Sequence, residues 1–287
     1  MNKEIEFFSI EDFESVENYL KSTFKASSNK LKKFFDKKFL NLPVKKKMQL
    51  NLPTDFIMDG EISPNYEGPE INIIYEDSNF LVLEKPEKIF VHPLTYLEKN
   101  NCLSFLRKNN FKFLNVNQNS YDRGLLYRLD YETSGVLIYI KDNELYKELR
   151  ANFSTIAKEK IYLCEVSGNC NLNGVYKHFF KSMGPKGNKI VVASEVKNIA
   201  DWDVGELEIK KLKFDEVLNL SLMEVRLKTG LRHQIRAQLA FLGYPLLGDY
   251  LYGGGSHSRL HLHAFKYSIL YKNTPIEFKS QICRFNI

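Results

Sequence analysis

The stretch at residues 126–140, LYRLDYETSGVLIYI, constrains the fold more than any other part of this chain. It ends in an apolar run, residues 136–140, that predicts a strand. A corner of small residues, 133–135, precedes this strand, and Arg128 and Asp130 stand before the corner. A carboxylate on a loop beside a cation, with a stiff strand behind it, is a candidate reactive group. The pattern alone leaves two interpretations open, because an Arg-x-Asp pair is usually a structural ion pair.

A second segment, residues 229–253, favours the reactive-group interpretation of Asp130 over the ion-pair interpretation. The two segments together resemble the RluA-type RNA pseudouridine synthases. The family signature H-R-L-D-x-x-T-S-G corresponds to residues 127–135. A second signature, T-G-R-x-H-Q-I-R-x-H-L-x-x-x-G-x-P-I-x-G-D-x-x-Y-G, corresponds to residues 229–253. Residues 75–93 resemble the family's opening strand and K-P…V-H-P loop, and residues 160–162 resemble its K-x-Y strand. The four blocks follow the family's order across residues 70–287, so an accidental match is improbable.

The pattern of apolar residues predicts an α+β fold. Strands are expected at residues 80–83, 136–140, 161–166, 218–227, 265–271 and 276–282. Helices are expected at residues 142–153 and 234–242, the second closed by Gly243 and Pro245. These elements do not alternate regularly, which argues against a doubly wound sheet. The resemblance implies the pseudouridine synthase fold, a mixed, mainly antiparallel sheet with the active site in a central cleft.

The resemblance also assigns catalytic roles to three side chains. Converting uridine to pseudouridine breaks a C–N glycosidic bond and forms a C–C bond to the same sugar carbon, so a nucleophile or anionic stabiliser is needed beside the ribose. Asp130 matches the family's carboxylate. Arg236 matches the arginine that pairs with it and keeps it ionised. Tyr162 matches the active-site tyrosine, whose ring can stack on uracil and whose hydroxyl, or a water it orients, can help remove the C5 proton.

Other matched residues are expected to contact the RNA. The target base must leave the stack, and Arg128 is our candidate to fill the gap, because a guanidinium stacks on bases and bonds phosphate. The remaining expected substrate-binding residues are Thr133, Arg232, His233, Gln234 and Ile235. Three positions depart from the family pattern, namely Tyr127, Leu231 and Gln238, where histidine, arginine and histidine are usual. These departures weaken any transfer of substrate identity.

The first 65 residues are expected to form a separate small module. Residues 11–23 have helical spacing, a second short helix starts near Ser27-Ser28, and a strand-like end runs to Ile62. Residues 21–47 carry ten lysines against the single Asp36. A solvated lysine face is the ordinary explanation of such a run, but the order resembles the αα-β RNA-binding module of the family. The expected RNA-binding lysines are Lys30, Lys32, Lys33 and Lys37. Residues 63–70 are the expected linker, with the catalytic domain at 66–287.

Net charge, hydropathy and cysteine spacing limit the partners, the cellular location and the metal sites that we expect. A net charge of +6 is compatible with a polyanionic partner without establishing one. The acidic start lacks the features of a secretory signal, and no apolar run approaches the length of a membrane span. The cysteines show no C-x-x-C pairing, and the H-x-H of His261 and His263 is a weak metal pattern. We therefore expect a cytoplasmic protein with no metal site. The resemblance implies an enzyme without a cofactor that acts on ribosomal or transfer RNA, and we expect it to be a monomer.

Two other functions remain in competition with this one. A catalytically inactive RNA-binding protein or chaperone on the same fold is the first, although all three catalytic side chains are present. A carboxylate hydrolase that uses Asp130 and Glu132 is the second. Retaining hydrolases place two carboxyl groups about 5 Å apart on opposite sides of a sugar bond. Residues two apart in one turn are poorly placed for that, and the run at 229–253 would be unexplained.

Overall fold

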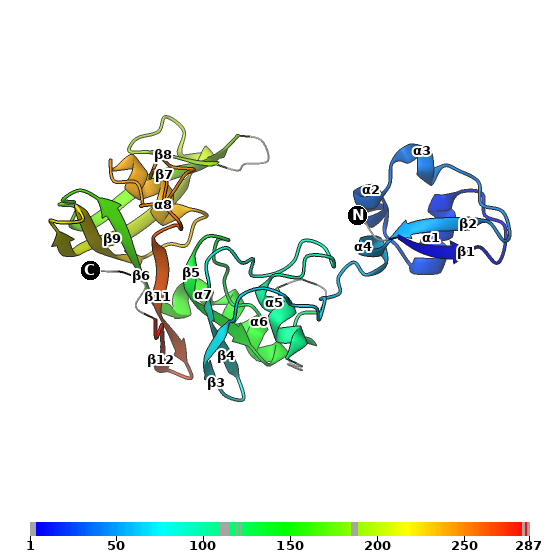
Figure 1. Cartoon of the computed structure of the whole chain (residues 1–287), viewed down its shortest axis with the longest axis horizontal. Helices are drawn as coiled ribbons and strands as arrows, with labels where there is room; N and C mark the ends of the chain where they lie inside the picture. The colour runs from blue at the N-terminus through cyan, green and yellow to red at the C-terminus, as the bar shows by residue number, and fades with distance from the viewer. Residues whose placement is uncertain are drawn as a thin grey trace.

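The computed structural model describes residues 4–109, 115–118, 120, 122–184, 189–282 and 285. Most strands belong to one ten-stranded sheet, and a smaller group of elements near the N-terminus lies apart from it (Figure 1). Two separate hydrophobic clusters correspond to these two regions. One is built from residues between 16 and 56, and the other from residues between 62 and 278. The proposed division of the chain into a module and a catalytic domain is consistent with this separation.

The small N-terminal region contains two strands and four helices. Strands β1 (Glu4–Phe8) and β2 (Gln49–Pro53) pair in antiparallel fashion. The helices are α1 (Val16–Phe24), α2 (Ser28–Phe34), α3 (Lys37–Leu40) and α4 (Thr54–Ile57). The expected cap of the second helix is confirmed, because the Ser27 hydroxyl accepts a hydrogen bond from the N–H of Lys30 at 3.2 Å. The expected αα-β order was incomplete, since β1 precedes the helices, and the strand expected to run to Ile62 ends at Pro53.

The large sheet has the order β3-β4-β5-β11-β6-β10-β9-β7-β8, with β12 beside β11. Its first half contains β3 (Asn72–Glu76), β4 (Phe80–Lys85), β5 (Ser134–Ile140), β11 (Leu262–Tyr271) and β12 (Thr274–Lys279). Its second half contains β6 (Ala157–Ser167), β7 (Gly174–Met183), β8 (Lys189–Ala193), β9 (Asp203–Asp215) and β10 (Leu220–Leu227). The pairs are antiparallel except for the parallel pair β5–β11. The expected mixed, mainly antiparallel sheet is confirmed.

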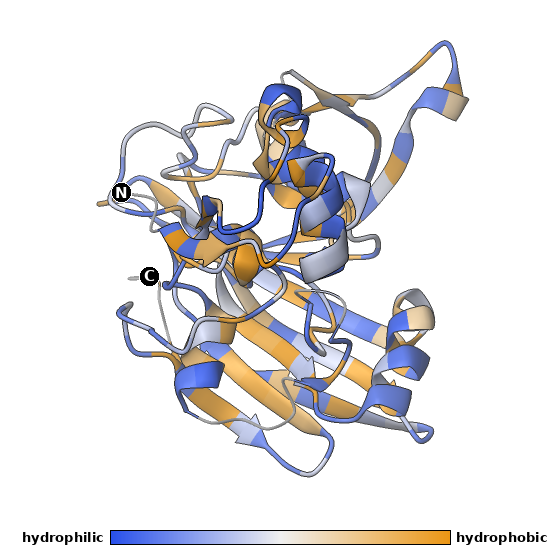
Figure 2. Ribbon diagram, turned by 90° about the vertical axis from the view of Figure 1, so that its right-hand side faces the viewer, coloured by the Kyte–Doolittle hydropathy of each residue, from blue (hydrophilic) through white to orange (hydrophobic). Residues whose placement is uncertain are grey.

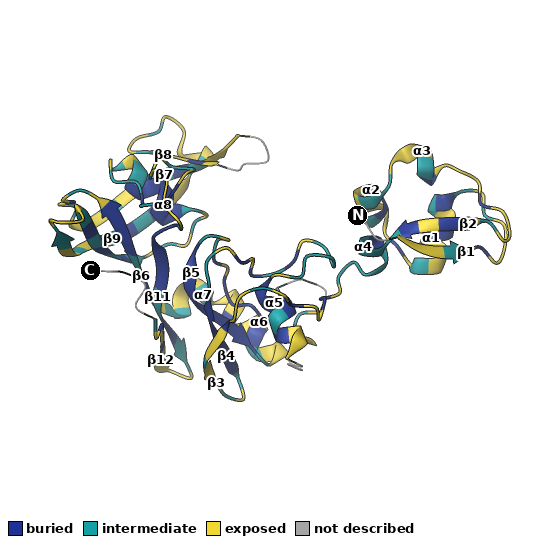
Figure 3. Ribbon diagram, viewed as in Figure 1, coloured by how far each residue is buried: buried dark blue, intermediate teal, exposed yellow. Residues whose placement is uncertain are grey.

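Helices pack against several strands of this sheet. They are α5 (Cys102–Lys108), α6 (Asn143–Ala151), α7 (Phe153–Ile156) and α8 (Gln234–Phe241). Hydrophobic colouring concentrates on the strands, whereas helices and loops are mostly hydrophilic (Figure 2). Every residue of β4 and of β5 is buried, as a strand in the middle of a packed sheet requires (Figure 3). The strands and helices expected in the catalytic region are therefore confirmed, with bounds that differ by a few residues.

Gly135 allows the parallel strands β5 and β11 to approach each other closely at the centre of the sheet. It faces Ala264 in the β5–β11 register and has φ of +117°. A Cβ atom at this position would lie 2.2 Å from the backbone oxygen of Ala264. Only glycine fits here, because it has no Cβ and tolerates positive φ. The end of β5 that follows Asp130 is thus fixed against β11.

Candidate active site

Asp130 lies in a tight turn directly before β5. The N–H of Thr133 donates to the carbonyl oxygen of Asp130 at 3.2 Å, which closes the turn. Thr133 is buried, and Ser134 is anchored by its hydroxyl, which lies 2.9 Å from Nδ1 of the buried His263. The carboxylate is therefore carried by a short turn whose far end is a rigid strand. Such support is what a precisely placed reactive group needs.

The N-terminal end of helix α8 carries the second group of side chains at the site. His233 stands at its N-cap with φ of +51°, which turns the chain sharply into the helix. Gln234 uses its amide to hold this entry, donating to the carbonyl oxygen of Glu206 at 3.1 Å and accepting from the Thr229 hydroxyl at 2.9 Å. Ile235 is buried and lines the cleft. Gln234 thus lies against the cleft while its side chain is committed to protein partners.

Arg236 connects the helix to Asp130. Its Nη1 atom lies 3.2 Å from Oδ2 of Asp130 and 3.4 Å from Oε2 of Glu132. Its Nε and Nη2 atoms donate to the two carboxylate oxygens of Asp249 at 2.8 and 3.0 Å. Burial acts to lower the pKa of Arg236, but the hydrogen bonds and charge of Asp249, with Asp130 and Glu132 beyond, outweigh it and raise the pKa. The guanidinium is a permanent cation in a fixed orientation.

The two oxygens of the Asp130 carboxylate are in different surroundings. Oδ2 faces Arg236 and also lies 3.7 Å from Nε2 of His233. Within the described residues, Oδ1 has no hydrogen-bond or ion-pair partner. The side chain of Asp130 is 29% exposed, whereas that of Arg236 is 5% exposed. The carboxylate is therefore held by one oxygen while the other remains available.

Tyr252 supports both groups that face Asp130. Its ring lies 5.6 Å from the guanidinium carbon of Arg236. Its hydroxyl oxygen accepts from the N–H of Ile190 at 3.0 Å and lies 3.0 Å from Nδ1 of His233. Burial lowers the pKa of His233, and the charges of Arg236 and Arg232 add to this effect against the opposite effect of Asp130. His233 is therefore a neutral imidazole at neutral pH.

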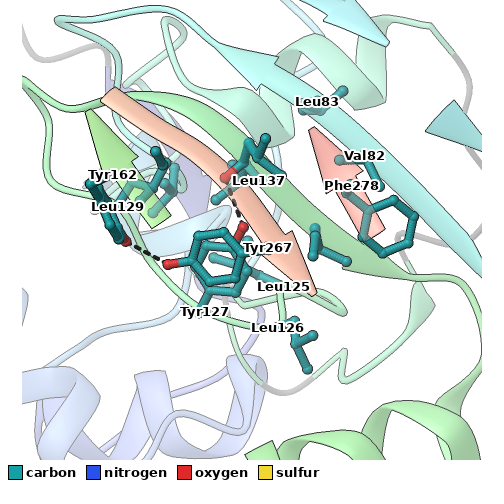
Figure 4. Close-up of a cluster of buried hydrophobic side chains, with 14 of the residues drawn as sticks. Val82, Leu83, Leu125, Leu126, Tyr127, Leu129, Leu137, Tyr162, Tyr267 and Phe278 are labelled. Atoms are coloured by element: carbon teal, nitrogen blue, oxygen red, sulfur yellow. Dashed lines mark hydrogen bonds between the residues drawn. The ribbon is translucent and has the colours of Figure 1, made fainter. Parts of the chain in front are cut away.

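Tyr162 belongs to a layer of buried aromatic side chains (Figure 4). Its hydroxyl is hydrogen-bonded to that of Tyr267, and the ring of Tyr267 stacks on Tyr127 with centroids 4.0 Å apart. The Tyr127 hydroxyl donates to the carbonyl oxygen of Val136 at 2.7 Å. Burial raises the pKa of Tyr162, so this side chain is a neutral phenol. Tyr127, where the family usually has histidine, thus packs in this aromatic layer.

A cleft of about 1110 Å³ joins these groups. It is lined by all nine catalytic and substrate-binding residues expected from the sequence, namely Arg128, Asp130, Thr133, Tyr162, Arg232, His233, Gln234, Ile235 and Arg236. The volume is large enough for a nucleotide, since small-molecule pockets commonly measure about 300–1,000 Å³. Segments that are more than 100 residues apart in the sequence therefore form one concave surface.

Arg128 does not pair with Asp130. Its side chain is exposed at the cleft, and among the described residues it has no ion-pair partner. The ion-pair explanation of the Arg-x-Asp pattern is therefore wrong for this chain. Arg232 is also exposed at the cleft.

The N-terminal lysines differ from one another in their surroundings. Lys33 and Lys30 face the same carboxylate, Asp59, at 2.9 and 3.8 Å. Lys32 and Lys37 are exposed and make no ion pair with any residue that the structure describes. The expected basic face thus has two paired and two unpaired members.

Lys85 is a buried cation that organises the loop next to the site. Its Nζ atom donates to the carbonyl oxygens of Ile89, Pro86 and Tyr131 at 2.7, 2.9 and 3.2 Å. Burial lowers its pKa to about 8, so it remains an ammonium with three donors at neutral pH. Sequence reasoning connected Lys85 and Pro86 only with a loop shape. The residue ties the turn after Asp130 to the loop that follows β4.

Sequence reasoning also gave no role to Asp249 and Tyr252. Both stand in the Gly-Asp-x-x-Tyr-Gly end of the second run, so their positions were visible in the motif. Their roles could not be read from the motif, because Asp249 acts on Arg236 in α8 and Tyr252 acts on His233 at its N-cap, 13 and 19 positions earlier.

Metal ligands, membrane helices and cysteines are the remaining features that the sequence raised. In the described ranges no group of three or more His, Cys, Asp or Glu side chains is arranged to bind a metal ion. The described helices include none that is long and apolar enough to cross a membrane. Cys102, Cys164 and Cys170 are buried free thiols, and Cys283 lies outside the described residues.

The mixed sheet with this cleft defines a pseudouridine synthase fold. Human RNA Pseudouridylate Synthase Domain Containing 1 superposes with a TM-score of 0.62 at 19% identity, covering 76% of this chain and 86% of that one. The human Domain Containing 4 protein gives a TM-score of 0.55 at 20% identity, covering 74% and 89%. At these identities the likeness shows the fold alone.

The chain belongs to the RNA pseudouridylate synthase family, whose model matches residues 79–241. Ribosomal large subunit pseudouridine synthase D of Borreliella burgdorferi is 33% identical over 222 residues, which are 74% of this chain and 65% of that protein. The protein of the same name from Buchnera aphidicola is 30% identical, over 77% of this chain and 67% of that protein. The match to the Pseudomonas aeruginosa protein, at 29% identity over 64% of this chain, spans only 54% of that protein's length.

Proposed function

We propose that this chain isomerises specific uridines to pseudouridine in structured RNA. The observation that carries the proposal is the position of Asp130, which faces a cleft with Oδ2 held by Arg236 and with Oδ1 unengaged by any residue that the structure describes. A carboxylate that faces a cleft can attack or stabilise an electron-deficient sugar carbon. Membership of the RNA pseudouridylate synthase family supports this chemistry.

The surrounding side chains suit the other steps of the reaction. The target uridine would swing out of its stack into the cleft, because its glycosidic bond cannot be reached inside folded RNA. Arg128, which is exposed at the cleft, would occupy the gap in the stack. Tyr162 would pack against the uracil ring, and its neutral hydroxyl would orient a water that carries the C5 proton away. Ile235 would form part of the apolar wall around the base.

Ribosomal RNA is the favoured substrate, with transfer RNA as the alternative. The Borreliella and Buchnera relatives are named for the large ribosomal subunit, and an additional basic N-terminal region suits a large folded RNA. We propose that Lys32 and Lys37, with Lys30 and Lys33 beside them, bind the phosphate backbone. Arg232 at the cleft edge would add a further phosphate contact.

The hydrolase hypothesis is disfavoured by the geometry of its two carboxylates. Asp130 and Glu132 both approach the same nitrogen of Arg236, at 3.2 and 3.4 Å. They therefore lie on one side of the cleft, whereas glycoside hydrolysis needs carboxyl groups on both sides of the scissile bond. An inactive RNA-binding protein would need no unengaged carboxylate in a cleft.

The test is pseudouridine mapping of total RNA from cells with and without the gene. Loss of a modification in the deletion strain, restored by the wild-type chain but not by Asp130→Asn, is the expected result. The variant keeps the size of the side chain, so its RNA affinity should stay within about twofold while turnover falls by several orders of magnitude. Normal turnover by Asp130→Asn would overturn the assignment of the carboxylate, and an unchanged map would overturn the proposed function.

A further inference from the structure

We infer that Phe90 and Tyr131 form a stacking platform for an RNA base that neighbours the target uridine. This inference rests on the proposed function. The two rings pack against each other in a tilted arrangement, with centroids 4.5 Å apart and an interplanar angle of 38°, so a base would stack on the outer face of the pair. They are 43% and 39% exposed, and both line the cleft that contains Asp130. An exposed aromatic pair at a cleft mouth leaves much ring surface in water, which a stacking partner would cover.

The position of the pair indicates which base it would meet. Tyr131 follows Asp130 directly in the chain, so the platform stands next to the reactive carboxylate. Tyr162, which is proposed to contact the target uracil, is buried deeper, on β6. The platform therefore lies nearer the surface than the target base and would receive an adjacent nucleotide. Arg128, exposed at the same cleft, supplies a positive charge for the backbone of such a nucleotide.

The platform is rigid because hydrogen bonds fix the backbone that carries the two rings. The ammonium of Lys85 binds the carbonyl oxygens of Tyr131 and Ile89, and the N–H of Ile89 donates to the carbonyl oxygen of Tyr131 at 3.3 Å. The carbonyl oxygen of Phe90 accepts from the N–H of Cys102 at 2.9 Å, at the start of α5. Ring surfaces fixed in this way lose little conformational entropy when a base stacks on them. Stacking on aromatic rings tolerates any base, so the platform would act through the position of the neighbour more than its identity.

The experiment uses the full chain with Asp130→Asn, which keeps the RNA unreacted. The probe is a 12-nucleotide uridine RNA with one central 2-aminopurine, whose fluorescence falls when it stacks on an aromatic ring. Phe90→Ala and Tyr131→Ala should each weaken binding by roughly fivefold or more and reduce the quenching, as loss of one stacked base predicts. Tyr131→Phe and Phe90→Trp keep a ring face and should retain both properties.

Two controls separate stacking from other effects. Phe241→Ala removes a ring that is 44% exposed on α8 and is not part of the cleft lining, so binding and quenching should not change. Phe90→Leu keeps an apolar side chain without a ring face, and it serves if Phe90→Ala fails to fold. The Phe90→Leu and Tyr131→Ala variants are compared with the Asp130→Asn chain that carries neither change. If both variants bind and quench the probe within twofold of that chain, the platform is overturned. Wild-type chain that binds and quenches this probe but forms no pseudouridine in cellular RNA would overturn the proposed function and leave the platform standing.

Discussion

Arg236 and Asp249 form a two-point ion pair behind the reactive carboxylate. The Nε and Nη2 atoms of Arg236 lie 2.8 and 3.0 Å from the two oxygens of Asp249, whose side chain is fully buried. The third nitrogen, Nη1, is left to face Asp130 at 3.2 Å. A bidentate pair fixes the plane of a guanidinium, so Asp249 determines where the remaining N–H groups point. The orientation of the cation at the active site is thus set by a residue that does not reach the cleft.

We expect Asp249→Ala to destabilise the protein strongly. The change leaves the guanidinium of Arg236 buried without its main partner, which typically costs about 3–5 kcal/mol. Unfolding in urea, followed by circular dichroism, should show a lower midpoint with an unchanged slope. The matched control is Glu132→Gln, which alters a more exposed contact of the same arginine and should cost less than about 1 kcal/mol. Equal effects of the two changes would contradict a structural role for Asp249.

The hydrogen bonds around Tyr252 predict the tautomer of His233. The Tyr252 oxygen already accepts from the N–H of Ile190, so its own proton is directed to Nδ1 of His233. The neutral ring then carries its proton on Nε2, which faces Oδ2 of Asp130 at 3.7 Å. The groups that act on this ring are Asp130, Glu132, Arg236, Arg232 and Tyr252.

Imidazole ¹⁵N chemical shifts at neutral pH will measure this tautomer, with the His233→Gln variant used for assignment. A single Nε2–H form is expected in the wild type, and Tyr252→Phe should give a mixture because it removes the donor to Nδ1. A ring protonated on Nδ1 in the wild type would contradict the arrangement. This readout does not depend on enzymatic activity.

Gly135→Ala should disrupt the centre of the sheet. The new Cβ would meet the backbone oxygen of Ala264 at 2.2 Å, so β5 and β11 could not keep their spacing. Gly174→Ala is the matched control, because Gly174 also has a strongly positive φ, +110°, with no atom within 4 Å of a new Cβ. The control reports backbone strain alone, on the order of 1 kcal/mol. The thermal midpoint should fall much further for Gly135→Ala, and similar shifts would contradict the steric explanation.

Lys85 should make stability depend on pH above neutrality. Its folded-state pKa of about 8 lies below the ordinary value of 10.5, so the unfolded chain binds more protons between these two values. Stability therefore increases as pH rises through this window, by roughly 3.5 kcal/mol at most, from about 1.4 kcal/mol per pH unit. Other groups titrate in the same range, so the relevant quantity is the difference between wild type and Lys85→Met. Parallel stability curves for the two proteins from pH 7.5 to 10.5 would contradict the lowered pKa.

The sequence predicted the parts of this protein whose patterns are local or strongly apolar. The run at 136–140 and the helix at 234–242 are examples, since a continuous apolar stretch and a Gly-Tyr-Pro ending need no tertiary context. Strand β9 was missed because its alternation, with Leu207 and Ile209 buried, breaks at Lys210-Lys211. Charged residues are common on the solvent side of an antiparallel sheet, and they obscure the period of two.

The residues of the candidate site were likewise predicted where they stand in a local motif and missed where only tertiary contacts define their role. Asp130 and Arg236 were found together because each stands in a motif, although they are 106 residues apart. Lys85 was recognised only as part of a loop, because a lysine beside a proline gives no sign that three carbonyl groups will surround it. The pairing of Lys30 and Lys33 with Asp59 was equally invisible, since it depends on how α2 packs near the end of α4.

The surroundings of the N-terminal lysines lead to a prediction about RNA affinity. Lys32→Glu with Lys37→Glu should weaken RNA binding and make it less dependent on salt, because removing one lysine–phosphate pair reduces the slope of log K against log salt by about 0.7–0.9. Lys33→Glu should also weaken binding, but it breaks the ion pair with Asp59, so its thermal midpoint must be compared with wild type. Lys147→Glu, on α6, provides the control for net charge, since this exposed lysine is not part of the cleft lining. Fluorescence anisotropy between 50 and 300 mM salt will give the slopes, and a slope equal to wild type in the double variant would rule out RNA binding by this face.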